Sequence, residues 1–358
     1  MKAICLDSQP CWCTESIREG VSVTDVIVMK GITKTFGEKV AVEELNLAVP
    51  QGAIYGLIGP NGAGKTTAIR MIMSILFPDK GKLSVLGKTS AVQSKDQIGY
   101  LPEERGVYKK MKVGSFLKHM GRLKGMKGSE VESKVKGWLE RVELGDCYKK
   151  RCDELSKGMQ QKVQFIASVL HEPELIILDE PFSGLDPVNM RLLRDLFLEQ
   201  HKAGKTLIFS THVMFQAEQL CEHIVMMNNG RKVLDASFAD IQARHDPKVI
   251  AFEPVGGLSG DAIETIEGID SVEKIGSQYE AAIRHGADTV GLVQQIVARI
   301  PVARIEIRKP TLEDIFIEIV EHDVADSDER DRLRSSLGGD GSGRAMAHAG
   351  TASGEGQV

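Results

Sequence analysis

The sequence predicts an α/β fold with a mainly parallel sheet, an antiparallel amino-terminal β-subdomain, a helical subdomain and a small carboxyl-terminal α+β domain. Short, wholly apolar runs such as Leu175–Leu178 are typical of parallel strands that are covered on both faces. Such runs alternate with helical segments, which indicates a parallel sheet with helices on both faces. Residues 26–49 instead alternate apolar and polar positions, which favours half-buried antiparallel strands. Residues 113–142 read as two helices joined by a link rich in glycine and lysine.

A glycine-rich stretch follows the apolar run Ala53–Ile58 and fits the phosphate-loop pattern G-x-x-x-x-G-K-[ST] at every specified position. Glycines allow positive φ and bring backbone N–H groups close to an anion, and the positive end of the following helix adds to the attraction. Lys65 supplies a charge for the β- and γ-phosphates, and the Thr66 hydroxyl is a hard oxygen ligand for Mg²⁺. The predicted nucleotide-binding residues here are Gly59, Pro60, Asn61, Gly62, Ala63, Gly64, Lys65, Thr66 and Thr67.

Two adjacent carboxylates, Asp179 and Glu180, end the apolar run Leu175–Leu178. Carboxylates at the end of a buried strand are costly unless a cation or a water molecule uses them. We therefore expect Asp179 to support Mg²⁺ and Glu180 to face the γ-phosphate and orient a water. The alternative is a pair of solvated loop acids.

Three further segments carry candidate site residues. His212 lies just beyond the predicted strand Thr206–Ser210, where it is either a satisfied polar residue or a reader of the γ-phosphate. Ser156 is a good N-cap and Gly158 leaves the first-turn amides open, although an ordinary capped helix explains this segment as well. Phe36 is either plain core or a platform for a purine.

The chain divides into four predicted parts. Residues 1–25 form an extension that we expect to be disordered, residues 26–240 a nucleotide-binding domain, residues 245–321 a small α+β domain, and residues 322–358 a disordered tail rich in charge, glycine, serine and alanine. Cys5, Cys11 and Cys13 crowd the start of the chain, but four zinc ligands at compatible spacing are not evident.

Bulk properties restrict the partners. The formal net charge of −5 and the pI near 6.0 give no global attraction to nucleic acid. No apolar run approaches the roughly 18–20 residues that a membrane span requires. The amino terminus also lacks the apolar core of a signal peptide, so we expect the protein in the cytosol, where ATP is available.

Residues 28 to about 235 resemble the nucleotide-binding domain of an ABC transporter. The resemblance rests on the order and spacing of four motifs: Walker A at Gly59–Thr67, Walker B at Leu175–Glu180, the D-loop at Ser183–Asp186 and the switch His212.

This resemblance implies roles for individual residues. Phe36 falls in the aromatic loop that stacks on adenine, and Asp186 falls in the D-loop beside the nucleotide. Glu180 corresponds to the general base or water-positioning residue, and His212 to the γ-phosphate sensor. Lys65 contributes to catalysis as well as to binding.

Two motifs depart from the family pattern. The signature LSGGQ is LSKGM here; it keeps Ser156 and the second glycine, Gly158, and the hydroxyl and backbone amides of this motif bind the anion. The glutamine of the Q-loop is replaced by Glu103, a carboxylate that can still bind Mg²⁺ but whose charge repels the γ-phosphate. YLPEERG, LSKGMQQKVQ and the ending PTLEDIFIEIV are similar to the branch of bacterial exporter ATPases that includes sodium and drug extrusion systems.

The family's mechanism implies partners and a location. One subunit's signature caps the ATP held by the Walker A loop of another, so a head-to-tail homodimer of this chain has two composite sites with ATP and Mg²⁺. The expected partner is a separately encoded membrane permease, which places the protein at the cytoplasmic face of the membrane. No nucleic-acid partner is expected.

Three other functions are alternatives to the interpretation as an exporter ATPase. One is a soluble ABC-type ATPase that acts as a nucleotide-gated regulator without transport. Another acts on ribosomes or DNA, but such proteins usually carry two nucleotide domains or a long coiled-coil insertion, and this chain has neither. The third is a non-hydrolysing nucleotide-gated interaction module, against which Glu180 argues.

Overall fold

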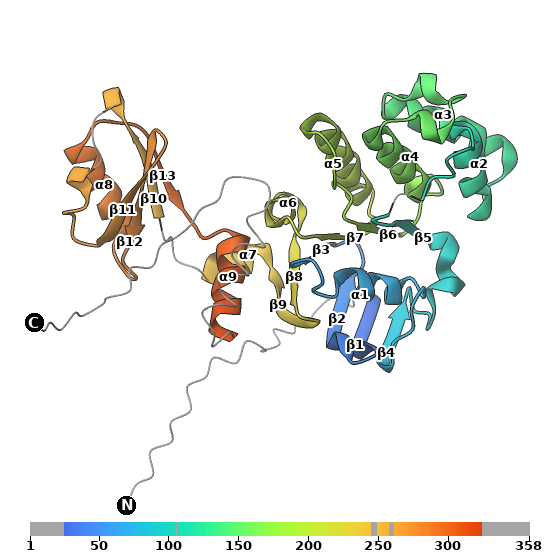
Figure 1. The fold of residues 1–358 in the computed structure, drawn as a ribbon, viewed down its shortest axis with the longest axis horizontal. Coiled ribbons are helices and arrows are strands. Elements are labelled where there is room, and N and C mark those ends of the chain that lie inside the picture. Colours follow the sequence, from blue (N-terminus) through green and yellow to red (C-terminus); the bar gives the residue numbers. More distant parts are fainter. Residues whose placement is uncertain (1–24, 105, 245–248, 258–260, 324–358) are drawn as a thin grey trace, which may run out of the picture. The chain divides into compact units, whose positions relative to one another are not determined.

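The computed structural model describes residues 25–104, 106–244, 249–257 and 261–323 (Figure 1). The predicted extension, apart from Asp25, lies outside these ranges, and with it Cys5, Cys11 and Cys13. The predicted tail lies outside them from residue 324 onward.

Strands and helices alternate along much of the described chain. The strands are β1 (Asp25–Phe36), β2 (Lys39–Pro50), β3 (Ile54–Ile58), β4 (Lys80–Val85), β5 (Ile98–Leu101), β6 (Leu175–Asp179), β7 (Thr206–Thr211), β8 (His223–Asn228), β9 (Arg231–Ser237), β10 (Val249–Pro254), β11 (Ile269–Ile275), β12 (Gln278–Ile283) and β13 (Val302–Arg308). The α-helices are α1 (Lys65–Ile72), α2 (Val113–Leu123), α3 (Gly128–Arg141), α4 (Lys157–Val169), α5 (Pro187–Lys202), α6 (Met214–Leu220), α7 (Phe238–Arg244), α8 (Thr289–Arg299) and α9 (Leu312–Asp323).

A six-stranded sheet with the order β5-β6-β7-β3-β8-β9 forms the centre of the fold. All neighbours in it pair in parallel except β8 and β9, which form the antiparallel hairpin that Asn229-Gly230 predicts. Every residue of β3, β6 and β7 is buried, which explains why these strands read as continuous apolar runs. The predicted mainly parallel α/β sheet is confirmed. Its strands β3, β6 and β7 end at one edge, where loops carry the polar residues.

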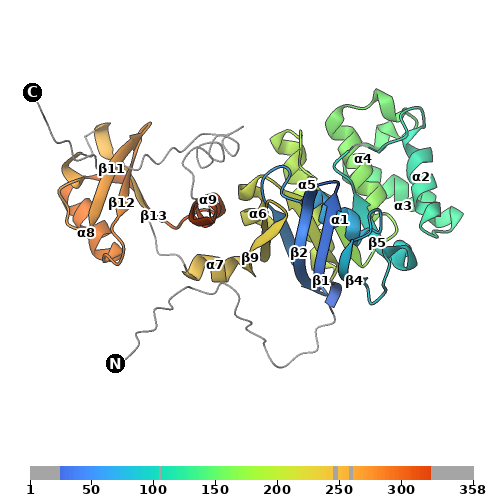
Figure 2. The same ribbon diagram turned by 60° about the horizontal axis from the view of Figure 1, so that its bottom comes forward.

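A second, antiparallel sheet with the order β2-β1-β4 shares a hydrophobic core with α1 and the central sheet. Figure 2 shows its strands side by side with α1. Alternate residues of β2 point into this core, among them Val42, Leu45, Leu47 and Val49. The alternation in residues 26–49 thus predicts these strands correctly.

Helices α2, α3 and α4 pack together as a helical subdomain (Figure 1). Trp138 of α3 meets Phe165 of α4 edge to face, with ring centroids 6.2 Å apart. Gly121 of α2 is needed for the close approach of these helices, because a Cβ there would lie 3.2 Å from Leu170.

The helix after the phosphate loop is shorter than predicted. Periodicity extends it from Thr66 to Leu76, but α1 ends at Ile72. The amides of Ile75 and Leu76 both bond to the Arg70 carbonyl, at 2.9 and 3.0 Å, and Ser74 has a φ of +55°. The chain therefore turns back and ends the helix at Ile72, although apolar residues continue in the sequence as far as Leu76.

Strands β10–β13 form a separate antiparallel sheet with the order β11-β12-β10-β13, and α8 lies on one of its faces. Stacked rings of Phe252 and Tyr279, 5.5 Å apart, lie in the core between them. The residue pattern predicts strands at Val249–Phe252 and Val302–Ile307, a helix near Thr289–Ala298 and another from Pro310-Thr311 to about Val320, which correspond to β10, β13, α8 and α9. It does not predict β11 and β12. Since most residues of β11 are exposed, it lacks the apolar alternation by which a strand is recognised.

Within the described residues, no helix combines the length and apolar character that crossing a membrane requires.

Phe209 is a direct test of the central core. Its fully buried ring meets Phe182 and Phe197 edge to face, with centroids 6.2 and 5.7 Å apart. We expect Phe209→Ala to lower the free energy of unfolding by about 3–5 kcal/mol in denaturant titrations, because it leaves a cavity between β7 and α5. Phe215→Ala, at a ring that is 67% exposed, should change it by no more than about 0.5 kcal/mol. Equal effects of the two variants would contradict this packing.

Candidate active site

The phosphate loop between β3 and α1 depends on glycine at three positions. Gly59, Gly62 and Gly64 have φ values of +144°, +83° and +103°, which side chains disfavour. A Cβ on Gly59 would lie 2.1 Å from the carbonyl oxygen of Met227, so the loop lies directly against the end of β8. This contact fixes the loop against the sheet, and the loop leads directly into the start of α1.

The amino terminus of α1 is not capped by a side chain. Its N-cap, Gly64, makes no side-chain capping bond, and the first turn has no acidic residue. By contrast, Ser156 and Asp186 cap α4 and α5 and accept the amides of Met159 and Asn189 at 3.3 and 2.9 Å. The first amides of α1 and the helix dipole therefore remain suited to a phosphate.

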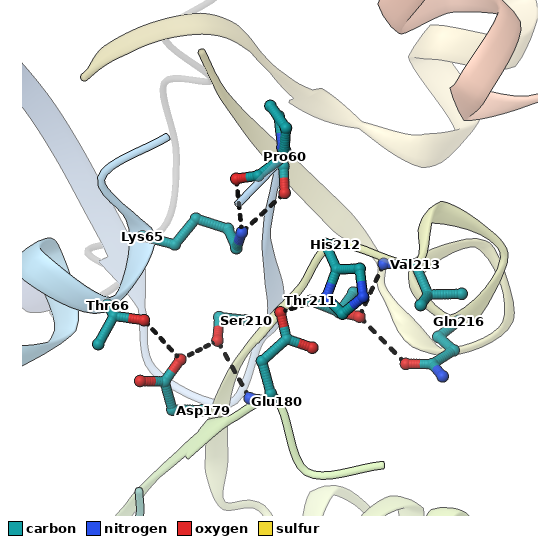
Figure 3. Close-up of polar contacts among 11 residues, drawn as sticks. Pro60, Lys65, Thr66, Asp179, Glu180, Ser210, Thr211, His212, Val213 and Gln216 are labelled. Atoms are coloured by element: carbon teal, nitrogen blue, oxygen red, sulfur yellow. Dashed lines mark hydrogen bonds and ion pairs between the residues drawn. The ribbon is translucent and has the colours of Figure 1, made fainter. Parts of the chain in front are cut away.

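The Lys65 ammonium lies over this loop (Figure 3). Its Nζ donates to the carbonyl oxygens of Gly59 and Pro60 at 2.7 and 3.0 Å, and the residue is only 5% exposed. Burial lowers the pKa of Lys65, and the nearby carboxylates of Glu180 and Asp179 oppose that shift. An ammonium group held beside this loop is suited to bind the terminal phosphates of a nucleotide.

Asp179 ends β6 with no exposed surface. Its Oδ1 accepts hydrogen bonds from the hydroxyls of Thr66, at 3.3 Å, and Ser210 (Figure 3). Burial raises the pKa of Asp179, and these two hydrogen bonds oppose the rise. Its other oxygen, Oδ2, is buried and has no hydrogen-bond partner among the described residues.

This unpaired oxygen bears on the metal that the sequence predicts. A buried carboxylate oxygen beside the Thr66 hydroxyl fits Mg²⁺, which prefers hard oxygen ligands. The part of the chain that the structure describes has no group of three or more His, Cys, Asp or Glu side chains that would hold a metal alone. An Mg²⁺ held by Thr66 and Asp179 would therefore need further oxygen ligands.

Glu180 follows Asp179 in a left-handed backbone conformation, with a φ of +48°. Its amide donates to both the carbonyl and the hydroxyl oxygen of Ser210, at 3.2 Å each. Its Oε1 lies 2.8 Å from Nδ1 of His212, as Figure 3 shows. The Glu180 side chain is 8% exposed and that of His212 43%, so the pair lies at the boundary between the core and solvent.

The turn that presents His212 has its own hydrogen bonds. The Thr211 hydroxyl donates to Oε1 of Gln216 at 3.1 Å and accepts the amide of Val213 at 3.0 Å (Figure 3). These contacts fix the end of β7 to the start of α6 on both sides of His212.

The structure brings five predicted site residues into one cluster: Lys65, Thr66, Asp179, Glu180 and His212. Glu103 lies just beyond β5 and is exposed. Its carboxylate is near enough to oppose slightly the burial-driven lowering of the Lys65 pKa, and to add slightly to the rise that Glu180 causes in the His212 pKa. Phe36 ends β1, 48% exposed, with Nζ of Lys34 5.5 Å from its ring centre. An exposed ring here is available for stacking and is not core.

The signature and D-loop residues form a second group. A Cβ on Gly158 would lie 3.5 Å from side-chain atoms of both Leu185 and Asn189. Ser156, Gly158 and Asp186 thus gather at the starts of α4 and α5. No hydrogen bond or ion pair joins these three to Lys65 or Thr66 within the described ranges.

Ser210 is the site residue that sequence reasoning misses. The signal for it is a hydroxyl at the carboxyl end of an otherwise apolar strand, beside a strand that ends in carboxylates. The parallel register that places Ser210 opposite Asp179 cannot be read from one sequence.

Comparisons with known proteins identify the family. A family model described as "ABC transporter" matches residues 42–183, and one described as "ATP-binding protein DrrA1-3-like, C-terminal domain" matches residues 237–320. The "Uncharacterized ABC transporter ATP-binding protein YhaQ" of Bacillus subtilis (strain 168) is 38% identical over 295 residues, which cover 82% of this chain and 98% of the relative. The chain belongs to the ABC transporter ATP-binding proteins. It is an ABC transporter ATPase.

Two further similarities agree with this family. The "Nod factor export ATP-binding protein I" of Rhizobium sp. (strain N33) is 32% identical to this ABC ATPase over 297 residues, which cover 82% of this chain and 96% of the relative. A solved structure titled "Structure of ATP binding subunit of ABC transporter" has a TM-score of 0.57 and 30% identity, and the match covers 61% of this chain and 92% of that one. The predicted P-loop fold of an ABC ATPase is confirmed.

The contact between Glu180 and His212 predicts a pH dependence. The hydrogen bond to Glu180 raises the pKa of His212 above its ordinary value of about 6.5, while partial burial opposes the rise. A raised pKa in the folded state means that the pair stabilises the fold fully below pH 6.5, and that this stabilisation is lost as the pH rises through the folded-state pKa. Glu180→Gln should lower the His212 midpoint in an NMR titration of the imidazole nitrogens.

The control variant is Glu199→Gln, which removes an exposed carboxylate on α5 and should leave the midpoint where it is. An equal midpoint in wild type and Glu180→Gln would contradict the pairing.

Proposed function

We propose that this ABC ATPase powers export through a separately encoded membrane permease, at the cytoplasmic face of the membrane. The cargo class is an ion such as sodium or a small molecule such as a drug. Export is supported by the similarity to the Nod factor export ATP-binding proteins and by the match of residues 237–320 to the DrrA1-3-like C-terminal model. The separate permease is supported by the finding that no helix in the described ranges suits a membrane span.

In this proposal the nucleotide lies along the edge formed by β3, β6 and β7. The amides at the start of α1 and the Lys65 ammonium bind the β- and γ-phosphates. Phe36, exposed at the end of β1, stacks on the adenine. Thr66, Asp179 and Glu103 hold Mg²⁺, which when bound neutralises charge on the phosphates.

Hydrolysis uses Glu180, which follows β6, and His212, which follows β7. Glu180 orients a water molecule and accepts its proton as the water oxygen attacks the γ-phosphorus. The bond to the bridging oxygen breaks, and ADP and inorganic phosphate are the products. His212, held 2.8 Å from Glu180, contacts the γ-phosphate and keeps the carboxylate directed toward it. Positioning and electrostatic stabilisation supply nearly all of the catalysis.

A homodimer completes the site. Ser156, Gly158 and Asp186 gather at the starts of α4 and α5, and within the described ranges no hydrogen bond or ion pair joins them to Lys65, so we infer that one copy of the chain holds both halves of a site without joining them. Head-to-tail pairing places the Ser156 hydroxyl and the first amides of α4 against the γ-phosphate held by a second copy, which gives two composite sites. ATP then closes the dimer, and hydrolysis with phosphate release reopens it.

The permease docks near Glu103 and helices α2 and α3, so that closure of the dimer moves it. Residues 245–321 form an accessory domain.

The single observation that carries the proposal is the meeting of Lys65, Thr66, Asp179, Glu180 and His212 at one sheet edge.

Two variants test the assigned roles. Lys65→Ala should weaken ATP binding by about 10- to 100-fold in calorimetry, because it removes a charged donor to the phosphates. Glu180→Gln should keep ATP affinity within a few-fold but lower phosphate release by about 10²- to 10⁴-fold, because it removes the base. Lys202→Ala, on α5 and exposed, is the matched control and should behave as wild type.

Unchanged affinity in Lys65→Ala would contradict the phosphate site, and unchanged turnover in Glu180→Gln would contradict the base. The dimer has its own readout: Glu180→Gln with Mg²⁺ and ATP should have twice the monomer mass by light scattering, whereas Glu180→Gln that also carries Ser156→Arg should remain monomeric. Co-purification of a membrane protein from native cells tests the permease, and its absence would favour a regulator without transport.

A further inference from the structure

Ser210 is the residue of β7 that lies between the two carboxylates of the Walker B motif. It is fully buried. It pairs with Asp179 of β6 on one side and with Leu57 of β3 on the other. Its place in the register is therefore fixed by both neighbouring strands.

The hydroxyl of Ser210 contacts both acids at once (Figure 3). It donates to Oδ1 of Asp179 and accepts the amide of Glu180 at 3.2 Å. A serine hydroxyl has one hydrogen and two lone pairs, so it can serve as donor and acceptor together. An alkyl side chain at this position would provide neither contact.

These contacts matter because both acids are held in states that cost free energy, Asp179 by its burial and Glu180 by its backbone conformation. Asp179 is a buried carboxylate, which needs donors to remain charged. With Thr66 and Ser210 both donating to Oδ1, Oδ2 is the oxygen left free beside the Thr66 hydroxyl. The hydroxyl of Ser210 thus selects which oxygen of Asp179 remains available.

Glu180 is held in a strained backbone conformation. A φ of +48° is unfavourable for a residue with a side chain and persists only where surrounding contacts enforce it. The Ser210 hydroxyl and carbonyl oxygens both accept the Glu180 amide. This anchoring directs the Glu180 side chain toward His212.

We propose that Ser210 is a positioning residue for ATP hydrolysis, which sets Oδ2 of Asp179 for the metal and the Glu180 carboxylate for the water through one shared hydroxyl. This inference rests on the roles proposed above for Asp179 and Glu180. In this proposal Ser210 acts through these two residues, whose contacts with its hydroxyl the structure shows.

The test compares Ser210→Ala, which removes the hydroxyl, with Ser210→Cys, which keeps the approximate shape but is a weak donor. Ser168→Ala is the matched control, because Ser168 is also buried and donates to the Phe165 carbonyl, away from the cluster. Glu180→Gln is measured in parallel. The readouts are kcat, KM for ATP, the Mg²⁺ concentration that half-saturates binding of a fluorescent ATP analogue, and the thermal unfolding midpoint.

We expect Ser210→Ala and Ser210→Cys to lower kcat by about 10- to 100-fold with KM changed less than threefold, the range expected for loss of hydrogen bonds to charged groups. Both should raise the half-saturating Mg²⁺ concentration several-fold, a binding readout that does not depend on turnover. Ser168→Ala should leave all of these at wild-type values. If Ser210→Ala does not fold, Ser210→Cys, which leaves little cavity, decides the question.

Wild-type kcat and Mg²⁺ dependence in Ser210→Cys would overturn the inference, since the position would then need only volume. So would losses in Ser210→Ala that Ser168→Ala reproduces. These outcomes are distinct from a failure of the proposed function: if Glu180→Gln itself retains full turnover, the assignment of the base is wrong. If Glu180→Gln is inactive and the Ser210 variants are normal, only the role of Ser210 is wrong.

Discussion

Two carboxylates and one ammonium are buried together at the edge where β3, β6 and β7 end, and the rest of the site depends on how their charge is balanced. Burial of an ion costs several kcal/mol unless other groups replace its hydration. Asp179 meets this cost with two hydroxyl donors and Lys65 with two carbonyl acceptors of its own loop. One oxygen of Asp179 has no hydrogen-bond partner among the described residues, and it is the oxygen that fits the proposed cation.

The fold makes this arrangement possible through backbone geometry. Parallel strands end at a common edge, so residues far apart in sequence, such as Lys65 and Glu180, become neighbours. Two left-handed or otherwise restricted backbone conformations lie at this edge: Gly59 lies against β8 with a φ of +144°, and Glu180 has a φ of +48°. The buried strands hold both conformations in place, and the strand ends and the start of α1 supply the site's polar groups.

The sequence predicts the central sheet well because β3, β6 and β7 are covered on both faces and therefore read as apolar runs. It predicts less where exposure hides the pattern, as in β11, or where a turn interrupts apolar residues, as after Ile72. Asp179 and Glu180 stand out because charge comes at the end of a buried strand, and Lys65 stands out because it occupies the lysine position of the phosphate-loop pattern. Ser210 does not, because its importance comes from its register opposite Asp179, which only the folded chain shows.

The most direct test of the account is the crystal structure of the wild-type protein with Mg²⁺ and a non-hydrolysable ATP analogue. Lys65 Nζ should leave the Gly59 and Pro60 carbonyls for oxygens of the β- and γ-phosphates, and Mg²⁺ should lie about 2.0–2.1 Å from the Thr66 hydroxyl, on the Oδ2 side of Asp179. A triphosphate bound elsewhere, or a Lys65 that keeps its carbonyl contacts beside a bound nucleotide, would contradict the account.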